Sequence, residues 1–387
     1  MDFAEGVIEA FVGPTELGAA DDLEAVIVDF IAAAEHSLDV AVQEVDSLPI
    51  AQALIDARWR GVAVRVVLEQ DYLQDRQQPR ATPRAGETEE QARIRVQWRQ
   101  DPPRELDINR DILAALLRNR VHVSADYNPD IFHQKFIVRD YRRGARPRSA
   151  LLTGSANFTH TDTHTNLNHL VIFHDPQVCN AYAVEFAQLN AGDFGRGQQG
   201  DVPRTVNLGG VPVKVLFAPN HSPELELVKQ ILKSRQRIDF AVFTFSGSSG
   251  VDDALILARR AGRQVRGVLD PGQAAQDWAA TRWLDDAEVE LFLPNRQPPF
   301  RKLHHKLTVI DDATVVAGSF NYTAPANDYN DENLFVLGSP HLDLPDNQGG
   351  PVDPYRCAQL TGFFRAEIDR IITAGNLYKP PERPPEL

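Results

Sequence analysis

Two histidine–lysine pairs have the residue types and the spacing that phosphate chemistry needs. The segment HQKFIVRD begins at His133 and the segment HHKLTVID begins at His304, and both fit the pattern HxKxxxxD. On a β-strand, side chains two residues apart share a face, so His133 should point with Lys135, and His304 with Lys306. Two imidazole–ammonium pairs that meet would surround a tetrahedral anion such as phosphate. The pattern therefore predicts phosphoryl transfer.

Each pair is followed by a GSxN segment, GSAN ending at Asn157 and GSFN ending at Asn321. Two copies of the combined pattern in one chain are not a chance of composition. The hydroxyl groups of Ser155 and Ser319 follow glycines at the expected end of a strand. We predict that they contact the substrate, with a simple turn as the alternative.

The two motifs belong to a longer internal repeat. LDVAVQEV beginning at Leu38 resembles IDFAVFTF beginning at Ile238, about 200 residues later. The offset then falls to 171 residues between the motif histidines and to 164 residues between the GSxN segments. The falling offset predicts two surface insertions in the first half, at about residues 71–107 and 141–148.

Alternating apolar strands and helix-like segments indicate an α/β fold. We predict two pseudo-symmetric lobes, each a mixed β-sheet flanked by helices, with one shared active site at the lobe interface. The first lobe would span residues 1–192 and the second residues 205–378. A glycine-rich linker, 193–204, would join them, and the Pro-rich segment 379–387 would be a tail.

The composition argues against a disordered, collagen-like or coiled-coil protein. Hydrophobic residues at 43% and charged residues at 24% are ordinary for a globular chain. The sequence has no apolar run of about 18 residues and its start does not resemble a signal peptide, so we expect a cytoplasmic protein without stable membrane association. The two cysteines, Cys179 and Cys357, should be buried thiols. With a net charge of −14, a polyanionic substrate would need a locally basic surface.

At the two HxKxxxxD/GSxN motifs the chain resembles the phospholipase D superfamily, and the resemblance spans nearly the whole sequence. It implies that one histidine attacks phosphorus to give a covalent phosphohistidine. The other histidine protonates the leaving oxygen and later activates water. It also implies that no metal or other cofactor is needed. The two motif lysines and the amides of Asn157 and Asn321 can hold the nonbridging oxygens.

The roles of the two histidines are predicted from a residue downstream of each GSxN. In the family, an acid or amide there hydrogen-bonds each catalytic histidine; here these residues are Asn168 and Glu332. We assume that each supports the histidine of its own half, as in the similar tyrosyl-DNA phosphodiesterases. A carboxylate beside His304 would then favour a general acid, and an amide beside His133 a neutral nucleophile.

Other polar residues of the motifs have structural interpretations. Asp140 and Asp311 should end their strands and accept hydrogen bonds from the backbone. His305 should point away from the site and pack. Three histidines follow the first GSAN, but no carboxylate is spaced to complete a metal site with them. We therefore assign a rim or turn role to His160, His164 and His169.

The substrate is predicted to be a nucleic acid, with DNA expected rather than RNA. The second motif is similar to that of the compact bacterial nucleases of the superfamily. The first insertion carries Arg93 and Arg95 next to Trp98, which could bind phosphates and stack on a base. The alternative is a solvated edge strand with ordinary arginine content. The expected activity is that of a metal-independent nuclease.

Two further classes stay open. A phospholipase D or phosphatidyltransferase acting on lipid is the alternative enzyme. A binding module without catalysis is the third interpretation, although both histidines and both lysines are intact. Some members of the family depend on a partner ATPase to deliver the substrate, and nothing in the sequence indicates one.

Overall fold

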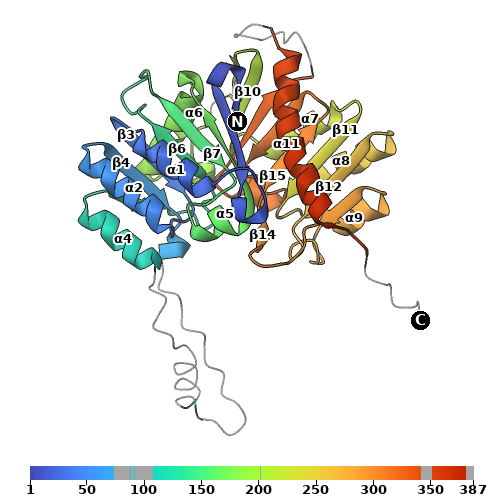
Figure 1. Ribbon diagram of the computed structural model, residues 1–387, viewed down its shortest axis with the longest axis horizontal. Coiled ribbons are helices and arrows are strands. Elements are labelled where there is room, and N and C mark those ends of the chain that lie inside the picture. The colour runs from blue at the N-terminus through green and yellow to red at the C-terminus, as the bar shows by residue number, and fades with distance from the viewer. Residues whose placement is uncertain (74–87, 89–90, 92–107, 201, 341–350, 381–387) are drawn as a thin grey trace.

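The computed structural model describes residues 1–73, 88, 91, 108–200, 202–340 and 351–380. These residues form two lobes, each built on a mixed β-sheet with helices against it (Figure 1). The predicted α/β fold is therefore confirmed. Part of the first predicted insertion, and with it Arg93, Arg95 and Trp98, lies outside the described residues.

The first sheet has the order β1-β2-β8-β7-β6-β3-β4-β5. Strands β3, β4 and β5 run parallel to one another, and the other neighbours are antiparallel. The strands of this lobe are β1 (Asp2–Phe3), β2 (Ile8–Gly13), β3 (Ser37–Val42), β4 (Ala63–Leu68), β5 (His122–Ala125), β6 (Lys135–Arg139), β7 (Ala150–Gly154) and β8 (Asn166–Phe173). Its helices are η1 (Ala4–Gly6), η2 (Thr15–Leu17), α1 (Leu23–Ala32), α2 (Leu48–Trp59), η3 (Gln70–Leu73), α4 (Ile108–Arg118), α5 (His160–His164), α6 (Pro176–Ala191) and η4 (Gly195–Gly197).

The second sheet has the order β18-β13-β12-β11-β15-β16-β17-β10-β9. Its segment β10-β17-β16-β15-β11-β12-β13 repeats the order β2-β8-β7-β6-β3-β4-β5 of the first, as the internal repeat predicted. The strands of this half are β9 (Thr205–Leu208), β10 (Val211–Ala218), β11 (Arg237–Val242), β12 (Gln264–Leu269), β13 (Glu290–Leu293), β14 (Lys302–Leu303), β15 (Lys306–Ile310), β16 (Thr314–Gly318), β17 (Glu332–Gly338) and β18 (Asn376–Leu377). Its helices are α7 (Pro223–Leu232), α8 (Gly250–Arg260), α9 (Thr281–Asp286), α10 (Ala324–Asp328) and α11 (Pro354–Ala374).

A shared apolar core joins the lobes. It contains residues from both sheets and from the two long helices α6 and α11, among them Phe136, Tyr182 and Phe335. Both cysteines, Cys179 on α6 and Cys357 on α11, are buried in this core as free thiols, as predicted. The outer faces of the sheets have separate cores under α1 and α2 in the first lobe and α7 and α8 in the second.

The two motif strands end in the same way. Asp140 and Asp311 follow β6 and β15 with φ of 56° and 50°, a left-handed conformation that aspartate tolerates better than most residues. The carboxylate of Asp140 accepts hydrogen bonds from the backbone N–H groups of Glu35, His36 and Ser37. Asp311 does the same for Arg235, Gln236 and Arg237. The predicted structural role of both aspartates is confirmed.

Backbone hydrogen bonds connect the two lobes just before each motif strand begins. Strand β14 pairs with β8 of the other lobe, and the N–H of His304 donates to the carbonyl of Leu167 at 2.8 Å. On the other side, the N–H of His133 donates to the carbonyl of Asp331, just before β17, at 2.9 Å. Each motif histidine is therefore held by the backbone of the opposite lobe.

The segment predicted as the second insertion, 141–148, forms a turn on the surface, and its residues 142–148 are exposed. Residues from 381 onward lie outside the described residues. In the part of the chain that the structure describes, no helix combines the length and the apolar character needed to cross a membrane.

Candidate active site between the lobes

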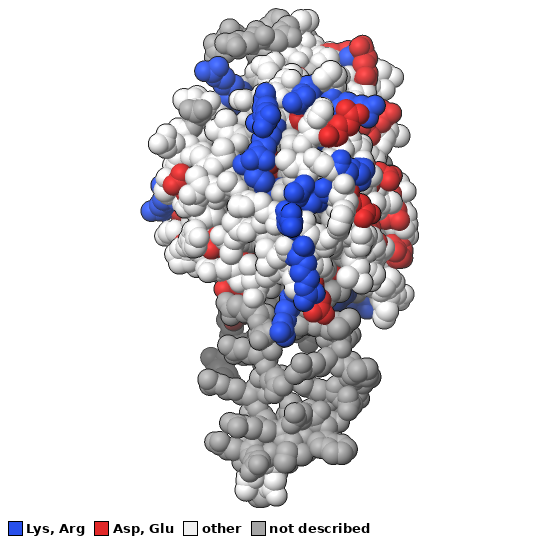
Figure 2. All heavy atoms as spheres, turned by 90° about the vertical axis from the view of Figure 1, so that its left-hand side faces the viewer, with Lys and Arg blue, Asp and Glu red and all other residues white. Residues whose placement is uncertain are grey.

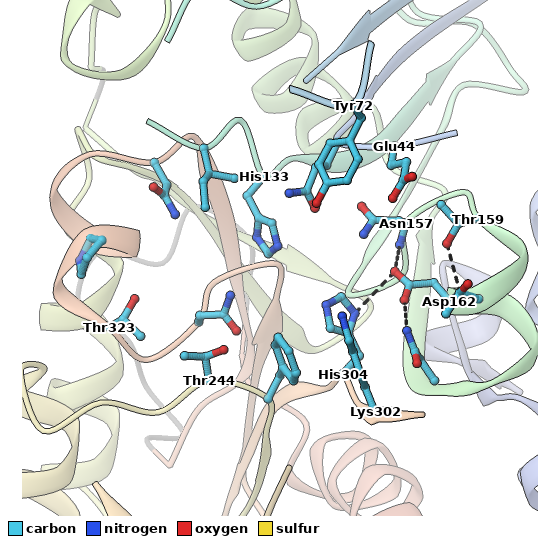
Figure 3. A pocket seen from close by; sticks show the side chains of 18 of the residues that line it. Glu44, Tyr72, His133, Asn157, Thr159, Asp162, Thr244, Lys302, His304 and Thr323 are labelled. Carbon is cyan, nitrogen blue, oxygen red and sulfur yellow. Dashed lines mark hydrogen bonds and ion pairs between the residues drawn. The ribbon is translucent and has the colours of Figure 1, made fainter. Parts of the chain in front are cut away.

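A cavity of about 890 Å³ lies between the lobes and is lined by residues of both. His133 and His304 face each other across it (Figure 3), with ring centroids 6.5 Å apart and ring planes at 79°. The amides of Asn157 and Asn321 also line the cavity. Their Oδ1 atoms are buried and have no hydrogen-bond partner among the described residues. The four motif side chains thus meet at one site, as predicted from their spacing.

The two motif lysines lie beneath the histidines and are almost fully buried. The Nζ atom of Lys135 donates to the carbonyl of His133 at 2.9 Å, and that of Lys306 donates to the carbonyl of His304 at 2.8 Å. Burial lowers the pKa of Lys135 to about 8. Burial and the positive charge of Lys135 lower the pKa of Lys306 well below its ordinary value. Burial removes the water that would otherwise solvate the two ammonium groups. An anion bound beside them would compensate for that loss, so the pair favours anion binding.

The glycines of the GSxN segments allow two chain segments to approach closely. A Cβ atom on Gly154 would lie 2.2 Å from the carbonyl oxygen of His169, and one on Gly318 would lie 2.4 Å from that of Asn333. Such contacts exclude any side chain at these two positions.

The serines of the same segments lie behind the site. The hydroxyl of Ser155 donates to Asn168 Oδ1 at 2.7 Å, and that of Ser319 donates to Glu332 Oε2 at 2.6 Å. Both serines are fully buried and neither lines the cavity. The predicted substrate contact of Ser155 and Ser319 is therefore wrong. Their hydroxyls instead orient Asn168 and Glu332, the residues that contact the motif histidines.

The residues downstream of the motifs support the histidines in a crossed arrangement. Nδ1 of His133 lies 2.7 Å from Oε2 of Glu332, which belongs to the second lobe. Nδ1 of His304 lies 3.1 Å from Oδ1 of Asn168, which belongs to the first. The prediction that each lobe supports its own histidine is wrong.

The crossing follows from the pairing of the lobes. Because β14 runs alongside β8, it brings His304 next to Asn168. The bridge between Phe132 and Asp331 brings His133 next to Glu332 in the same way. An alignment of the two repeats identifies equivalent residues, but it does not contain this contact between different repeats.

Burial makes both motif imidazoles weak bases. Desolvation, together with the charges of Lys135 and Lys306, lowers the pKa of His133 well below its ordinary value. The same causes lower the pKa of His304. Burial raises the pKa of Glu332 to about 8, against the opposing effect of the two lysines. The His133–Glu332 pair is therefore a buried contact in which His133 stays uncharged.

Asp162 is a site residue that the sequence did not indicate. It lines the cavity from the short helix α5, and its Oδ2 lies 3.5 Å from Nδ1 of His304 (Figure 3). Oδ2 also accepts the backbone N–H of Asn157 at 2.7 Å. The equivalent position in the second lobe is Ala326. Since the repeat offers no carboxylate there, the repeat comparison carried no signal for Asp162.

His305 and His169 lie behind the motif histidines His133 and His304. Both are fully buried, and their rings stack with centroids 5.4 Å apart and Nδ1 atoms 3.1 Å apart. The packing role predicted for His305 is confirmed. The rim or turn role predicted for His169 is wrong, because this residue faces the inter-lobe core from the opposite side of β8 to Asn168.

The other two histidines after the first GSAN lie on α5. His160 is exposed and His164 is partly buried, and their rings lie 4.4 Å apart. Together with Glu24 of α1 they form a group whose ligand atoms all lie within 4.8 Å of one another. This group does not include the motif histidines His133 and His304.

Comparison with known proteins identifies the fold and the family. The chain matches the family described as "Cardiolipin synthase, PLD-like domain" over residues 27–190 and 227–344. It also resembles the crystal structure of phosphatidylserine synthase from Haemophilus influenzae, with a TM-score of 0.59 and 12% sequence identity. That likeness covers 97% of this chain and 88% of the other.

Curated relatives match over part of their length. Phospholipase D of Rickettsia bellii is 31% identical over 130 residues, which are 34% of this chain and 63% of that protein. Mitochondrial cardiolipin hydrolase of Xenopus laevis is 33% identical over 110 residues, 28% of this chain and 50% of that protein. The chain thus spans less than two thirds of either relative. The family match covers more than half of this chain and both motif segments, so the chain belongs to the phospholipase D superfamily.

Proposed function

We propose that this protein is a phosphodiesterase that cleaves the backbone of a nucleic acid through a covalent phosphohistidine. The observation that carries the proposal is the facing arrangement of His133 and His304, whose ring centroids lie 6.5 Å apart. A tetrahedral phosphorus between two imidazoles can be attacked from one side while the leaving group departs on the other, as in-line displacement requires.

His133 is the nucleophile in this mechanism. When its Nδ1–H donates to Glu332, the lone pair of Nε2 is free to attack phosphorus. The new P–N bond places positive charge on the ring, and Glu332 stabilises that charge when it is ionised. Burial raises the pKa of Glu332 to about 8, so the ionised form gains population as the pH rises toward that value. The sequence favours His133 as nucleophile because it predicts an amide beside that histidine. The structure places the carboxylate of Glu332 there instead, and a carboxylate also suits a nucleophile.

His304 is the general acid and then the general base. It protonates the leaving oxygen as the P–O bond breaks, which releases an alcohol. In the second step it accepts a proton from water, which attacks phosphorus and breaks the P–N bond, so that a phosphomonoester is released and His133 is restored. Asn168 orients the ring. Burial and the two lysines lower the pKa of His304, and the carboxylate of Asp162 at 3.5 Å, together with the negative charge of the bound phosphodiester, opposes that effect and favours the protonated form that an acid needs.

Lys135 and Lys306, with the amides of Asn157 and Asn321, bind the nonbridging oxygens. Their charges and donors are fixed by the fold before the substrate arrives, so little reorganisation is needed when negative charge develops in the transition state.

Two features favour a nucleic acid as substrate. Most side chains lining the cavity are polar, including Lys302 and Arg301, and its aromatic side chains Tyr72, Phe243 and Trp278 offer surfaces for bases. Such a lining suits sugars, phosphates and bases better than acyl chains. DNA is proposed ahead of RNA, and a cytoplasmic location remains part of the proposal.

The second feature is a basic surface on the first lobe. Figure 2 shows Lys and Arg side chains gathered in a band on the side that carries α2 and α4. A groove of about 430 Å³ at the start of β4 is lined by Arg58, Arg65, Arg120 and Arg142. It lies at the opposite end of β4 from the active site, roughly 20 Å away by strand length. A polymer of phosphates can reach such a distance, whereas one lipid headgroup cannot.

A lipid substrate is the second candidate. It is favoured by the names of the relatives, a phospholipase D and a cardiolipin hydrolase, and by that of the structural neighbour, a phosphatidylserine synthase. The same chemistry would serve, with water or an alcohol attacking a phosphatidyl-histidine.

One experiment separates the candidates. The purified chain is incubated in EDTA with labelled single- and double-stranded DNA and RNA, and separately with vesicles containing phosphatidylcholine or cardiolipin. We expect cleavage of DNA by the wild type and none by His133→Ala or Lys306→Ala. Lipid hydrolysis with no action on any oligonucleotide would transfer the assignment to the second candidate. No phosphodiester cleavage of either kind would contradict the proposed catalysis.

A further inference from the structure

We propose that Glu24, His160 and His164 form a zinc site on the outer side of helix α5, separate from the catalytic histidines. The three residues come from two elements: Glu24 from the first turn of α1, and the two histidines from the ends of α5. Residues four apart on a helix share a face, so His160 and His164 project together. Two imidazoles and a carboxylate form a ligand set that zinc commonly uses, with a fourth position left for water.

The distances fit zinc without rearrangement of the backbone. Nε2 of His164 lies 3.3 Å from Oε2 of Glu24. Two ligands bound tetrahedrally at about 2.0–2.1 Å from a zinc ion lie about 3.3–3.4 Å apart. The third ligand is near, because one nitrogen of His160 lies within 4.8 Å of the other ligand atoms. His160 is exposed, so its side chain can adjust to close the remaining gap.

The residues around the group would orient the ligands. Nδ1 of His164 lies 2.6 Å from Oε1 of Glu16, which leaves Nε2 facing Glu24. The other oxygen of Glu24 accepts the hydroxyl of Ser47 at 2.6 Å, so that Oε2 is turned to the histidine. A carboxylate that accepts the second N–H of a histidine is the usual outer partner of a zinc ligand. A simple ion pair would need only one carboxylate beside His164. The presence of Glu16 on one ring nitrogen and Glu24 near the other is the arrangement expected of a metal ligand with an outer partner.

The proposed zinc would connect the surface to the active site through α5. The N–H of His160 donates to Asp46, and the same short helix carries Asp162, which contacts His304. A metal bridging α5 to α1 would hold this five-residue helix in place. The expected contribution is to the stability of the helix, and no step of the phosphodiester cleavage passes through the metal.

The test is calorimetric titration of the full chain, freed of metal by chelation, with Zn²⁺ alone. We expect saturable binding of one zinc per chain, and at least ~10-fold weaker binding by His160→Ala, since loss of a ligand should cost no less than loss of an outer partner. His160 is exposed, so this variant should fold. Bound Co²⁺ should give the visible absorption typical of tetrahedral coordination, and Zn²⁺ should raise the melting temperature of the wild type but not that of His160→Ala.

Two control variants test whether any loss of zinc binding is specific to the proposed ligands. His174→Ala removes a surface histidine that, among the described residues, forms an ion pair with the single carboxylate of Glu9, and it should leave the affinity for zinc unchanged. His304→Ala removes the catalytic histidine and should also leave it unchanged. Equal affinity in His160→Ala and wild type, loss of binding in His304→Ala, or no saturable binding at all would each overturn the proposal.

Discussion

Oε2 of Glu332 in the second lobe lies 2.7 Å from Nδ1 of the motif histidine His133 in the first lobe. The pair is buried, and the hydroxyl of Ser319 donates to the same carboxylate oxygen. Neither lobe therefore contains the whole pair, because the histidine and its carboxylate come from different repeats. Any loosening of the lobe interface should reduce activity even when both histidines remain intact.

Replacing Glu332 with glutamine should slow formation of the covalent intermediate. The amide keeps the shape but not the charge that stabilises the phosphohistidine, so we expect a rate loss of about 10- to 100-fold, the usual range for such outer partners. Single-turnover kinetics measures this step. The matched variant Asn168→Asp adds a carboxylate beside the other histidine and should leave attack by His133 within a few-fold of wild type. Equal effects of both variants on the attack would contradict the crossed assignment.

Replacing Asp162 with asparagine should weaken His304 as an acid. Natural substrates, whose leaving alcohols need a proton, should react about 10- to 100-fold more slowly, in the range expected for acid–base assistance. A nitrophenyl phosphodiester releases a stable anion, so its initial burst should be nearly unaffected. Asp46→Asn, on the same wall of the cavity, is the control and should affect both substrates equally little. A purely structural loss would slow both substrates alike.

The sequence predicted the two histidine–lysine pairs because the members of each pair are close together in the chain. His133 and Lys135 are two residues apart on a strand, so their common face follows from strand geometry alone. The similarity of the two sheets also followed from the internal repeat, but the order of the strands within each sheet did not. The burial of His305 came from the same alternation of faces.

Contacts between segments that are distant in the chain could not be predicted from the sequence. Whether Glu332 supports His133 or His304 depends on how β17 and the opposite lobe pack, and no local pattern records that pairing. Asp162 reaches His304 only because α5 folds over the cavity. Glu24 meets His164 because α1 lies against α5, 140 residues apart in the chain.

The binding of anions should weaken as the pH rises through about 8. The pKa of Lys135 is lowered to about 8 by burial, so this side chain is charged below that pH and neutral above it. Sulfate does not titrate in this range, so its dissociation constant reports the charge of the protein. We expect weaker sulfate binding at pH 9 than at pH 7, and no such change in Lys135→Arg if that variant still binds. Constant affinity up to pH 10 would show that the lysines keep ordinary pKa values.

Replacing Lys135 with methionine should stabilise the fold while abolishing activity. The pKa of this lysine is lower in the folded than in the unfolded chain, so at pH 7 the folded state pays for holding the charge. Removing it should raise the free energy of unfolding by about 1–3 kcal/mol. Denaturant unfolding at pH 7 and pH 9 measures the effect, which should shrink at the higher pH. A destabilised variant at pH 7 would mean that the cation contributes to folding.

Replacing Asp140 with alanine should destabilise the first lobe. Three backbone N–H groups would lose their acceptor, and alanine would occupy a left-handed conformation, so we expect a loss of roughly 3 kcal/mol. Asp311→Ala should cost a similar amount in the second lobe. Below the melting temperature both variants should retain the catalytic rate, and a fully folded but inactive variant would assign these aspartates to the chemistry instead.

In the proposed mechanism, His133 bonds to phosphorus while His304 protonates the leaving group. This is tested most directly by acid-free quenching of a reaction with labelled phosphodiester, followed by mass spectrometry of the peptides. We expect a phosphoryl adduct on His133, longer-lived in His304→Ala with a nitrophenyl substrate because water is no longer activated. An adduct on His304, or adduct formation by His133→Ala, would contradict it.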